Sequence, residues 1–576
     1  MRAVDNNDRK SCGMAGDVTT DFLVIGSGAG GMTAAIVAAE LGAQSLVIEK
    51  ADRYGGTTAL SGGGIWIPNN DSMKSVGIAD SEQDAITYLK QVVGPAVSES
   101  KLRAYVRAAP AMVRFMGERS PVRFHCAERY ADYYPELEGG RKGGRTMDPL
   151  PFNLNRLGDE FARMRWPDYL TGFMRYAVTM RESREMMDMS LKGSWYMLRN
   201  MARYYLDVPG RMRGLPDRRL TLGRALVGSC RRAMLDRGIP LWLNTCAEEL
   251  LVEDGRIVGA QVTRNGEPLL IRARRGVLLA AGGMGQNVAM RQQYGQLPTG
   301  ETFSSANDDD MGDGIRMGLQ CGAALEFMGS AWWTPSIRLP NGNLQALITG
   351  KSMPGSIFVD SRGKRYCNEA APYEDVVKAQ WRNHRDNAPT VPGHMIFDAR
   401  FRHNYMLGTM PPGKIQNDAM IQREYIDSGF LKKADTLAEL AAQIGIDAAG
   451  LEQTVARANE FARTGKDLDF GRGDSATDRY YSDPKIKPNP NLAPIVAPPF
   501  YSVSVYPGDL GTKGGLKFDE FARVQRDNGD IIEGLYVTGN CAGSVMADSY
   551  PGAGSTIGPS MTFGYVAARH ALGQTS

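Results

Sequence analysis

Asp21-Phe-Leu-Val-Ile25-Gly26-Ser-Gly28-Ala-Gly30-Gly31 is the stretch that decides the fold of this 576-residue chain. Its apolar first half is typical of a buried strand, and its glycines lead into an alanine-rich helical stretch, Met32–Leu41. A second apolar run, Ser45–Ile48, ends at Glu49, 23 residues after the first glycine. This order of strand, glycine turn, helix and strand predicts a β-α-β unit and an α/β fold.

The spacing of the glycines indicates a nucleotide site of the Rossmann type. Glycines at this turn let the backbone approach a pyrophosphate at a helix N-terminus, where free N–H groups and the helix dipole favour an anion. Glu49 would accept hydrogen bonds from ribose hydroxyls and would disfavour a 2′-phosphate. The alternative is a tight turn without a ligand, since such glycine patterns also occur by chance in a chain with 67 glycines.

Three further glycine-rich turns follow, the first soon after this unit and the other two far along the chain. Tyr54–Gly64 contains hydroxyl side chains, Val277–Ala281 leads into Gly282-Gly283, and Gly534–Asn540 precedes Gly552–Gly558, which opens an expected C-terminal helix. One nucleotide needs one such turn. Four turns spread over the chain indicate a long cofactor assembled from distant segments, and FAD fits this better than NAD.

Composition excludes several classes of protein. The chain is 43% apolar and 23% charged, as in ordinary globular proteins, and its net charge of +3 gives no indication of nucleic acid. Seven scattered cysteines argue against a disulfide framework and suit a reducing compartment. We expect no secretory signal, no membrane span and, from the spacing of the five histidines, no metal site. The prediction is a cytoplasmic protein.

The glycine turns also predict the domain organisation. Residues 17–329 form the first part of the cofactor domain and 506–576 the second, after a flexible N-terminus at 1–16. Residues 330–505 lack nucleotide-type turns and are interpreted as an inserted α+β substrate domain.

Seven stretches between about residues 21 and 572 carry a family resemblance. They are Val24–Gly30, Gly55–Pro68, Ala131–Pro135 (Ala-Asp-Tyr-Tyr-Pro), Gly144–Pro149, Arg365–Tyr373 (ending Ala-Pro-Tyr), Asp509–Leu516 and Tyr550–Pro559 (Tyr-Pro-Gly-Ala-Gly-Ser-Thr-Ile-Gly-Pro). On these motifs the chain resembles the flavoproteins related to fumarate reductase and, within them, the 3-oxosteroid 1-dehydrogenase (3-ketosteroid Δ1-dehydrogenase) family. The resemblance implies a glutathione-reductase-like FAD domain with an inserted catalytic domain of the fumarate reductase type.

The resemblance also implies an activity, the oxidation of C1–C2 of a 3-ketosteroid to a double bond. Tyr550 and the backbone N–H of Gly554 would hold the C3 carbonyl oxygen. Tyr373 would take the C2 proton with help from Tyr133, and flavin N5 would take hydride from C1. Tyr134 is adjacent to Tyr133, so a shift of one residue would exchange them. A tyrosine is a poor base unless a second donor or a positive neighbour favours its phenolate.

The cofactor is expected to be non-covalent FAD, because no histidine follows the Gly55-Gly56 loop. The electron acceptor is expected to be quinone-like, and the steroid side chain and the oligomeric state stay open. The residues expected to hold FAD are Gly26, Ser27, Gly28, Ala29, Gly30, Gly31, Glu49, Lys50, Gly56, Thr57, Thr58, Ser61, Gly62, Gly63, Ala247, Ala281, Gly282, Asp313, Gly539, Asn540, Ser555 and Ile557.

Three rival functions exist on related folds. A dicarboxylate reductase would carry a histidine before the Gly-Gly of Asp509–Leu516, where this chain has Thr512-Lys513. A 3-ketosteroid Δ4-(5α)-dehydrogenase pairs its C-terminal tyrosine differently, without Tyr-Pro-Gly-x-Gly. A lipid-binding escort protein would lack the tyrosine set and would be colourless.

Residues 163–219 differ from the rest of the chain. They hold nine methionines, and eleven arginines and one lysine against six acidic residues give them a net charge of +6. Leu191, Trp195, Leu198, Ala202 and Tyr205 follow helical spacing. One interpretation is a helical pair packed on the domain surface. The other is a segment that lies on an anionic membrane and attaches the protein peripherally to the inner face of the cytoplasmic membrane.

Overall fold

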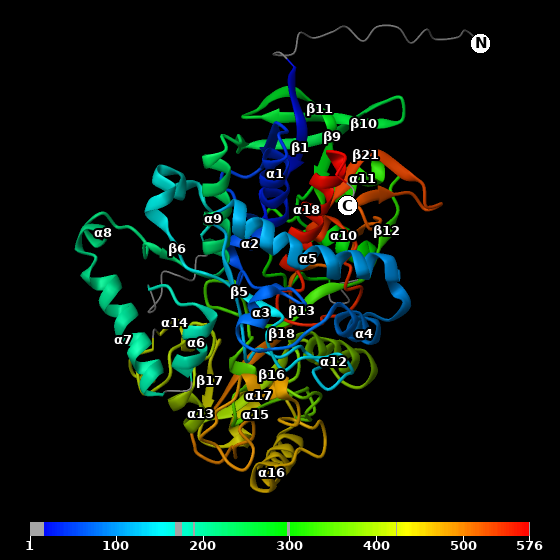
Figure 1. Ribbon diagram of the computed structural model, residues 1–576. Coiled ribbons are helices and arrows are strands. Elements are labelled where there is room, and N and C mark those ends of the chain that lie inside the picture. The colour runs from blue at the N-terminus through cyan, green and yellow to red at the C-terminus, as the bar shows by residue number, and fades with distance from the viewer. Residues whose placement is uncertain (1–16, 167–175, 188–189, 296–299, 422, 575–576) are drawn as a thin grey trace.

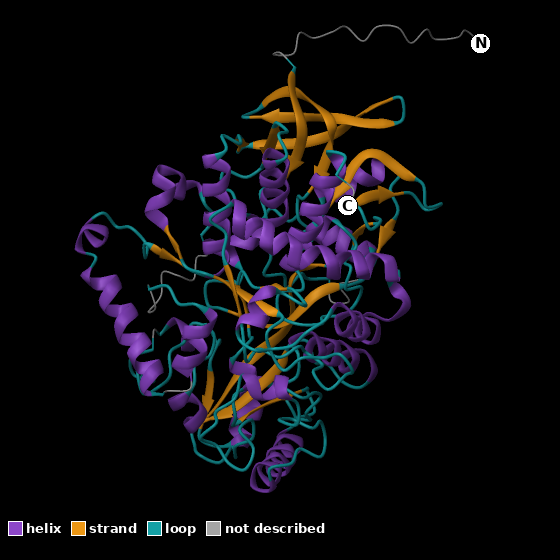
Figure 2. Ribbon diagram, viewed as in Figure 1, coloured by secondary structure: helices purple, strands orange, loops and turns teal. Residues whose placement is uncertain are grey.

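The computed structural model describes residues 17–574 apart from 167–175, 188–189, 296–299 and 422 (Figure 1). The N-terminus expected at 1–16 lies outside the described residues. Two sheets organise this part of the chain, one in the upper part of the view and one in the lower part (Figure 2). Helices pack around both, so the α/β class expected from the sequence is confirmed.

The first sheet is built around the predicted β-α-β unit. Its central strand β1 (Val18–Ile25) lies between β11 (Glu267–Leu279) and β2 (Ser45–Ile48), and both pairings are parallel. Strand β1 begins three residues earlier than expected because Val18–Thr20 also pair with β11. The remaining strands are β8 (Leu241–Trp242) beside β2, β21 (Ile531–Val537) and β20 (Arg523–Gln525) beyond β11, and the hairpin β9 (Thr245–Glu253) and β10 (Arg256–Arg264).

Glycines allow the turn after β1 to pack against distant segments. A Cβ atom on Gly26, whose φ is +109°, would lie 2.3 Å from the Ala280 carbonyl oxygen at the end of β11. Helix α1 (Ala29–Glu40) lies against the C-terminal helix α18 (Ile557–Ala571), and a Cβ on Gly564 would lie 2.4 Å from the Gly30 oxygen. Backbone therefore meets backbone at the point where three parts of the chain converge.

The second sheet is formed by strands that lie between Ala331 and Thr512. Strand β18 (Phe500–Thr512) pairs with β13, β16 and β17, so the domain boundary expected at 505 falls inside a continuous strand. Helix α12 (Tyr373–Asp386) packs on β13, and α15 and α16 cover the outer end. The other elements are β13 (Ala331–Arg338), β14 (Leu344–Ala346), β15 (Ser356–Val359), β16 (Gly393–Asp398), β17 (Lys432–Ala434), α15 (Leu437–Ile444) and α16 (Ala448–Thr464).

Shorter elements join the two sheets. They include the small sheet β3-β5-β4, the two-stranded sheet β12-β19 and helices α2, α4, α5, α9 and α11. Their bounds are β3 (Ile65–Trp66), β4 (Phe124–Cys126), β5 (Thr146–Pro149), β12 (Leu325–Glu326), β19 (Gly515–Leu516), α2 (Gly56–Leu60), α4 (Glu82–Val93), α5 (Glu99–Arg119), α9 (Leu222–Asp236) and α11 (Asp313–Gln320).

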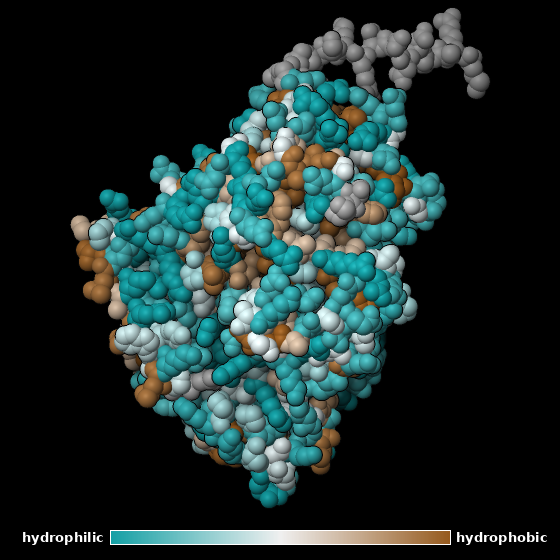
Figure 3. All heavy atoms as spheres, viewed as in Figure 1, coloured by the Kyte–Doolittle hydropathy of each residue, from teal (hydrophilic) through white to brown (hydrophobic). Residues whose placement is uncertain are grey.

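The described part of residues 163–219 forms helices α6 (Met180–Met187), α7 (Leu191–Leu206) and α8 (Val208–Met212) at the left edge of the view. The predicted apolar stripe of α7 faces outward, with Leu191 93% and Trp195 60% exposed. Apolar spheres gather over α7 and α8 (Figure 3). The inward face of α7 carries Gly193, Asn200 and Tyr204 instead.

Within the described residues, six of the twelve basic side chains of this segment form ion pairs with acidic side chains of the same segment. These ion pairs leave the net charge of the segment at +6, because that sum already includes the acidic residues. Basic side chains pair with acidic ones of the same segment at Arg199–Glu182, Arg203–Asp217, Arg211–Asp207, Arg218–Asp207, Arg219–Glu182 and Lys192–Glu185. No helix within the described ranges is both long and apolar enough to cross a membrane.

The glycine turn gives a stability prediction. In Gly26→Ala, the new methyl overlaps backbone and φ stays positive, so we expect a loss of roughly 3 kcal/mol or more in the free energy of unfolding. Gly42→Ala is the matched control, since Gly42 has φ +86° and nothing within 4 Å of the added Cβ; it should lose about 1 kcal/mol. Urea unfolding measures both, and equal losses would contradict this view of the turn.

Candidate active site

The turn after β1 presents an open backbone face. Gly28 caps α1, and a Cβ built on it would meet only the Thr58 hydroxyl, at 3.7 Å. The Ala29 N–H donates to the same hydroxyl oxygen at 3.2 Å. Glu49, at the end of β2, accepts from the Ser27 hydroxyl at 2.6 Å and from the Ser27 N–H at 3.1 Å. The structure thus brings these five predicted residues to one helix N-terminus.

The second glycine loop lies against the first. The Gly55 N–H donates to the Ser27 hydroxyl at 2.9 Å, and Gly62 has open space where a Cβ would be. Gly63 has a different reason to be glycine, because a Cβ there would lie 2.5 Å from the Gly223 nitrogen of α9. Thr57 and Ser61 bond within the protein, to Asn307 and to the Thr58 carbonyl oxygen.

The more distant predicted residues join this site from three directions. Lys50 pairs with Asp313 at the start of α11, with 2.6 Å between Nζ and Oδ2. Ala247 lies on β9, whose first residue, Thr245, donates its N–H to the Glu49 carbonyl oxygen at 2.9 Å. Ala281 and Gly282 lie two and three residues beyond the end of β11 at Leu279.

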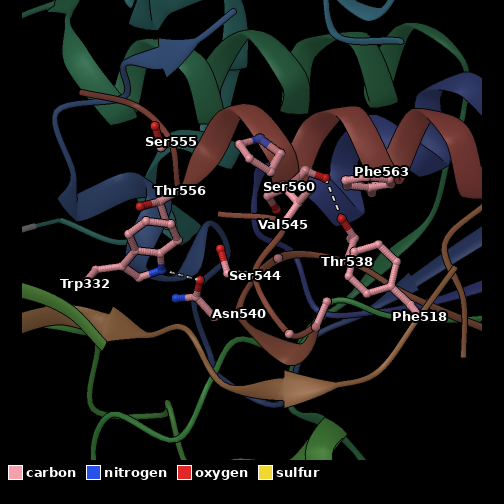
Figure 4. A pocket seen from close by; sticks show the side chains of 14 residues that line it. Trp332, Phe518, Thr538, Asn540, Ser544, Val545, Ser555, Thr556, Ser560 and Phe563 are labelled. Carbon is pink, nitrogen blue, oxygen red and sulfur yellow. Dashed lines mark hydrogen bonds between the residues drawn. The ribbon is translucent and has the colours of Figure 1, made fainter. Parts of the chain in front are cut away.

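A pocket of about 330 Å³ lies where the C-terminal segment meets β13 (Figure 4). Its lining includes the predicted residues Gly539, Asn540 and Ser555, and Ile557 begins α18 just beyond. Trp332 Nε1 donates to Asn540 Oδ1 at 3.1 Å across one side of the pocket. Open glycine faces at one helix N-terminus and a pocket formed by distant segments fit a long dinucleotide cofactor.

Three tyrosines from separate segments meet between the two sheets. The ring centroids of Tyr133, Tyr373 and Tyr550 are 5.2–5.3 Å apart in every pair. Tyr373 is the first residue of α12, and Tyr133 is held by its N–H, which donates to the Pro551 carbonyl oxygen at 2.9 Å. The Trp332 ring, which also lines the cofactor pocket, lies 4.8 Å from that of Tyr550.

Burial keeps these phenols neutral. It raises the pKa of Tyr133 and of Tyr373 well above the usual value, and it raises that of Tyr550 as well. The Tyr133 hydroxyl is buried and has no hydrogen-bond partner among the described residues. Tyr134 turns away and donates to Asp375 at 3.0 Å. Of the two adjacent tyrosines, Tyr133 is therefore the one that faces Tyr373 and Tyr550.

Gly554 lies four residues after Tyr550, and within the described residues the hydrogen bonds of its backbone involve only its carbonyl oxygen. Its carbonyl oxygen accepts from the Trp66 and Gly558 N–H groups, while its own N–H donates to no described residue. With φ at +97° and a would-be Cβ 2.4 Å from Ile65, no other residue fits. Helix α18 begins three residues later, at Ile557, so Gly554 precedes the helix rather than opening it.

A second pocket of about 330 Å³ opens beside Tyr133 and Tyr373. Lys351 is buried in its wall, and its ammonium donates to the Ala371 carbonyl oxygen at 2.6 Å and the Glu369 carbonyl oxygen at 2.9 Å. Burial lowers the pKa of Lys351 to about 8. The other lining side chains are largely apolar or aromatic and include Tyr130, Ile348, Ala370, Pro372, Tyr480 and Tyr481.

Several residues of the site were missed in the sequence. Trp332 and Lys351 lie in no glycine turn, and neither residue type nor spacing sets them apart. Lys513 was noticed only as a departure from a histidine, although it lies fully buried beside Trp332 and Tyr550. Its place in a glycine-flanked motif, Gly511-Thr-Lys-Gly514, was the available signal.

Comparison with known proteins identifies the family of this chain. Residues 21–557 match the FAD binding domain family. The 3-oxosteroid 1-dehydrogenase of Mycobacterium tuberculosis is 41% identical over 96% of this chain and 98% of its own length. The chain belongs to the 3-oxosteroid 1-dehydrogenase family. It is an FAD-dependent oxidoreductase, as the resemblance implied.

Solved structures agree with this family. The crystal structure of 3-ketosteroid Δ1-dehydrogenase from Sterolibacterium denitrificans, in complex with 1,4-androstadiene-3,17-dione, superposes with a TM-score of 0.93 at 44% identity, covering 96% of this chain and 99% of that one. A flavocytochrome c3 fumarate reductase shares the fold alone, with a TM-score of 0.62 at 21% identity over 97% of this chain and 78% of that one. The expected fumarate reductase flavoprotein fold is thus confirmed.

The open face of Gly28 gives a prediction for cofactor binding. In Gly28→Ala, the added methyl meets no protein atom closer than 3.7 Å, so folding should be unaffected, while the methyl enters the space left for the pyrophosphate. We expect FAD affinity to fall by roughly tenfold or more, about 1.4 kcal/mol. Gly117→Ala, with no atom near its added Cβ, is the control. Titration of the apoprotein with FAD measures this affinity. An unchanged affinity in Gly28→Ala would contradict the assignment of Gly28 to the pyrophosphate site.

Proposed function

We propose that the protein desaturates the C1–C2 bond of 3-ketosteroids. The observation that carries this is the meeting of Tyr133, Tyr373 and Tyr550 next to the cofactor pocket. The ligand in the Sterolibacterium denitrificans structure, 1,4-androstadiene-3,17-dione, supports a steroid as substrate. An apolar ring system suits a pocket lined by neutral aromatic side chains, because neutral phenols cost little to bury.

Tyr550 and the Gly554 N–H are the proposed donors to the C3 carbonyl oxygen. A hydrogen on the carbon next to a ketone becomes acidic when donors stabilise negative charge on the ketone oxygen. In a site closed to water, each such donor contributes roughly 3–4 kcal/mol. The free N–H of Gly554 and the neutral phenol of Tyr550 are both in the protonation state that donation needs.

Tyr373 is the proposed base for the C2 proton, acting as its phenolate. Burial raises the pKa of Tyr373 and so disfavours the phenolate. A second hydrogen-bond donor therefore has to stabilise the negative charge of the phenolate. The unpartnered hydroxyl of Tyr133 is in place for this, with the two rings 5.3 Å apart. The C2–H bond breaks and its proton goes to the Tyr373 oxygen, while the electron pair left on C2 becomes the C1–C2 double bond as C1 loses hydride.

FAD, when bound, supplies the two-electron acceptor for that hydride. The residues that would hold it are those of the open glycine faces and of the pocket in Figure 4. As the final electron acceptor we propose a quinone-like compound from outside the chain. The chain's own contribution is to orient the steroid, exclude water and hold the proton.

The tyrosine assignment is tested by anaerobic turnover of 4-androstene-3,17-dione with an artificial acceptor. We expect Tyr550→Phe and Tyr373→Phe to lower kcat by about 10²–10³-fold, because the first removes a donor to the C3 oxygen and the second removes the proposed base for the C2 proton. Tyr134→Phe is the matched control and should keep activity within about threefold, since its hydroxyl faces Asp375. Full activity in both active-site variants would remove the assignment.

The product distinguishes the rival steroid activity. With 5α-androstane-3,17-dione, a 1-dehydrogenase forms a C1–C2 double bond, whereas a Δ4-(5α)-dehydrogenase forms a C4–C5 double bond. We expect the first product, identified by the NMR signals of its vinyl hydrogens. Formation of the C4–C5 product would overturn the proposed regiochemistry.

We also propose that α7 and α8 dock on the membrane through apolar contact. The support is the outward apolar stripe, continued by Leu206 (77% exposed) and Met212 (84% exposed). Because the exposed stripe itself is apolar, we expect apolar burial to contribute most of the binding. A steroid partitions into bilayers, so docking there would shorten its path to the protein.

Vesicle co-sedimentation tests the docking. Replacing Leu191, Trp195 and Leu198 together by Ser should reduce the bound fraction at least about threefold on neutral and on anionic vesicles alike. The same substitutions at Val252, Val288 and Leu319, which are exposed elsewhere, are the control. Unchanged binding would remove the proposal, and loss on anionic vesicles alone would restore the electrostatic interpretation.

A further inference from the structure

A buried lysine connects two of the three tyrosine segments. Lys513 directly follows β18 and has no exposed surface. Its ammonium donates to Glu374 Oε2 at 2.6 Å and to the Ser549 carbonyl oxygen at 2.8 Å. Glu374 is the residue after Tyr373, and Ser549 is the residue before Tyr550. One side chain therefore ties the start of α12 to the loop that carries Tyr550.

The same ammonium lies against the aromatic wall of the site. Lys513 Nζ is 4.7 Å from the Trp332 ring centroid and 5.7 Å from that of Tyr550. A cation over an aromatic face is attracted by the electrons of the ring, and the attraction is stronger where water is excluded. The positive charge thus acts directly on the phenol proposed to hold the substrate oxygen.

Stability alone does not account for this arrangement. A fully buried ammonium is costly, and burial lowers the pKa of Lys513 although Glu374 opposes the shift. Replacing a buried ion pair by apolar side chains is often neutral or stabilising. Glu374 is also paired from its other side by Lys378, at 2.8 Å, so its charge would stay compensated without Lys513.

We propose that Lys513, with Glu374, is a positioning residue for the desaturation. The pair sets the separation of Tyr373 and Tyr550, and the charge of Lys513 strengthens Tyr550 as a hydrogen-bond donor to the ketone oxygen. This assignment rests on the proposed function. It gives a role to the lysine that stands where dicarboxylate reductases are expected to carry a histidine.

The electrostatic part of the role follows from where charge develops. When the C2 proton leaves, negative charge moves to the C3 oxygen, and the hydrogen bond from Tyr550 shifts part of it onto the phenol. A cation beside that phenol in a dry site stabilises the shifted charge more than it stabilises the uncharged ketone. Lys513 should therefore act on enolisation more than on the binding of the ketone.

Two measurements on FAD-loaded protein separate this role from a structural one. The first is exchange of the C2 hydrogens of a 3-ketosteroid with D₂O under anaerobic conditions, which follows proton removal. The second compares the affinities of a dienone, 1,4-androstadiene-3,17-dione, and of a steroid with a phenolic A ring, which resembles the enol and can share its proton. Both affinities come from the change in flavin absorbance on titration.

Lys513→Met is expected to slow exchange of the C2 hydrogens by about tenfold or more. It should also weaken the binding of the phenolic steroid about tenfold more than the binding of the dienone. Lys513→Arg should recover part of both effects, because it restores the charge. Lys378→Met is the matched control, since Lys378 pairs with the same Glu374 but is partly exposed; it should leave the affinity ratio within about threefold.

The assignment would be overturned if Lys513→Met weakened the binding of both steroids equally, or if it left the rate of C2 hydrogen exchange unchanged. If Lys513→Met does not fold, Glu374→Gln provides the same test, because it weakens the hold on the ammonium without removing it. A wild type that exchanges no C2 hydrogen overturns the proposed function and this assignment with it. A wild type that exchanges, beside a Lys513→Met variant that exchanges as fast, overturns this assignment alone.

Discussion

Close approach of backbone to backbone around Gly26, Gly30 and Gly31 is the constraint on which the cofactor side of the molecule depends. No side chain fits between the turn after β1, the end of β11 and helix α18. Because these segments come from the beginning, middle and end of the chain, their contact is what brings the predicted cofactor residues to one place. The high glycine content is in part a packing requirement, as Gly63 against α9 also shows.

The part of the site around Tyr133, Tyr373 and Tyr550 depends on apolar and aromatic surroundings. Around the three tyrosines the walls are largely aromatic and the phenols are buried, so a neutral phenol costs less to place there than a carboxylate. The same burial raises the pKa values of Tyr133 and Tyr373, which suits donation and opposes base chemistry. A base role for Tyr373 therefore needs Tyr133, and a strong donor role for Tyr550 gains from Lys513. Position, more than residue type, decides what each phenol can do.

Local patterns in the sequence were sufficient for the elements of the first sheet. The run 21–25, the helix after it and Ser45–Ile48 correspond to β1, α1 and β2, with differences of up to three residues at their ends. These elements are decided by short-range apolar patterning and by glycine. The spacing of the α7 stripe was likewise readable, but its outward direction was not, because that depends on what Gly193, Asn200 and Tyr204 pack against.

The cluster of three tyrosines was predictable only through the family resemblance. Nothing in the spacing of Tyr133, Tyr373 and Tyr550 indicates that residues more than 170 positions apart share a site. Contacts of that kind are decided by how β13, β18 and α12 pack. Lys513 and Trp332 show the same limit, since a buried cation on an aromatic wall has no local signature. Segment 163–219 shows it for charge, because its sequence does not indicate which of its basic residues pair with which acidic residues in the folded chain.

The order of strands in the first sheet has a consequence for how the protein is made. Strand β1 leaves the ribosome first, yet its neighbour β11 ends at Leu279 and the next strand, β21, at Val537. Helix α18, which closes the glycine contact, follows later still. The nascent chain must therefore hold an unfinished sheet through most of its synthesis, and flavin loading has to wait until the last helix emerges.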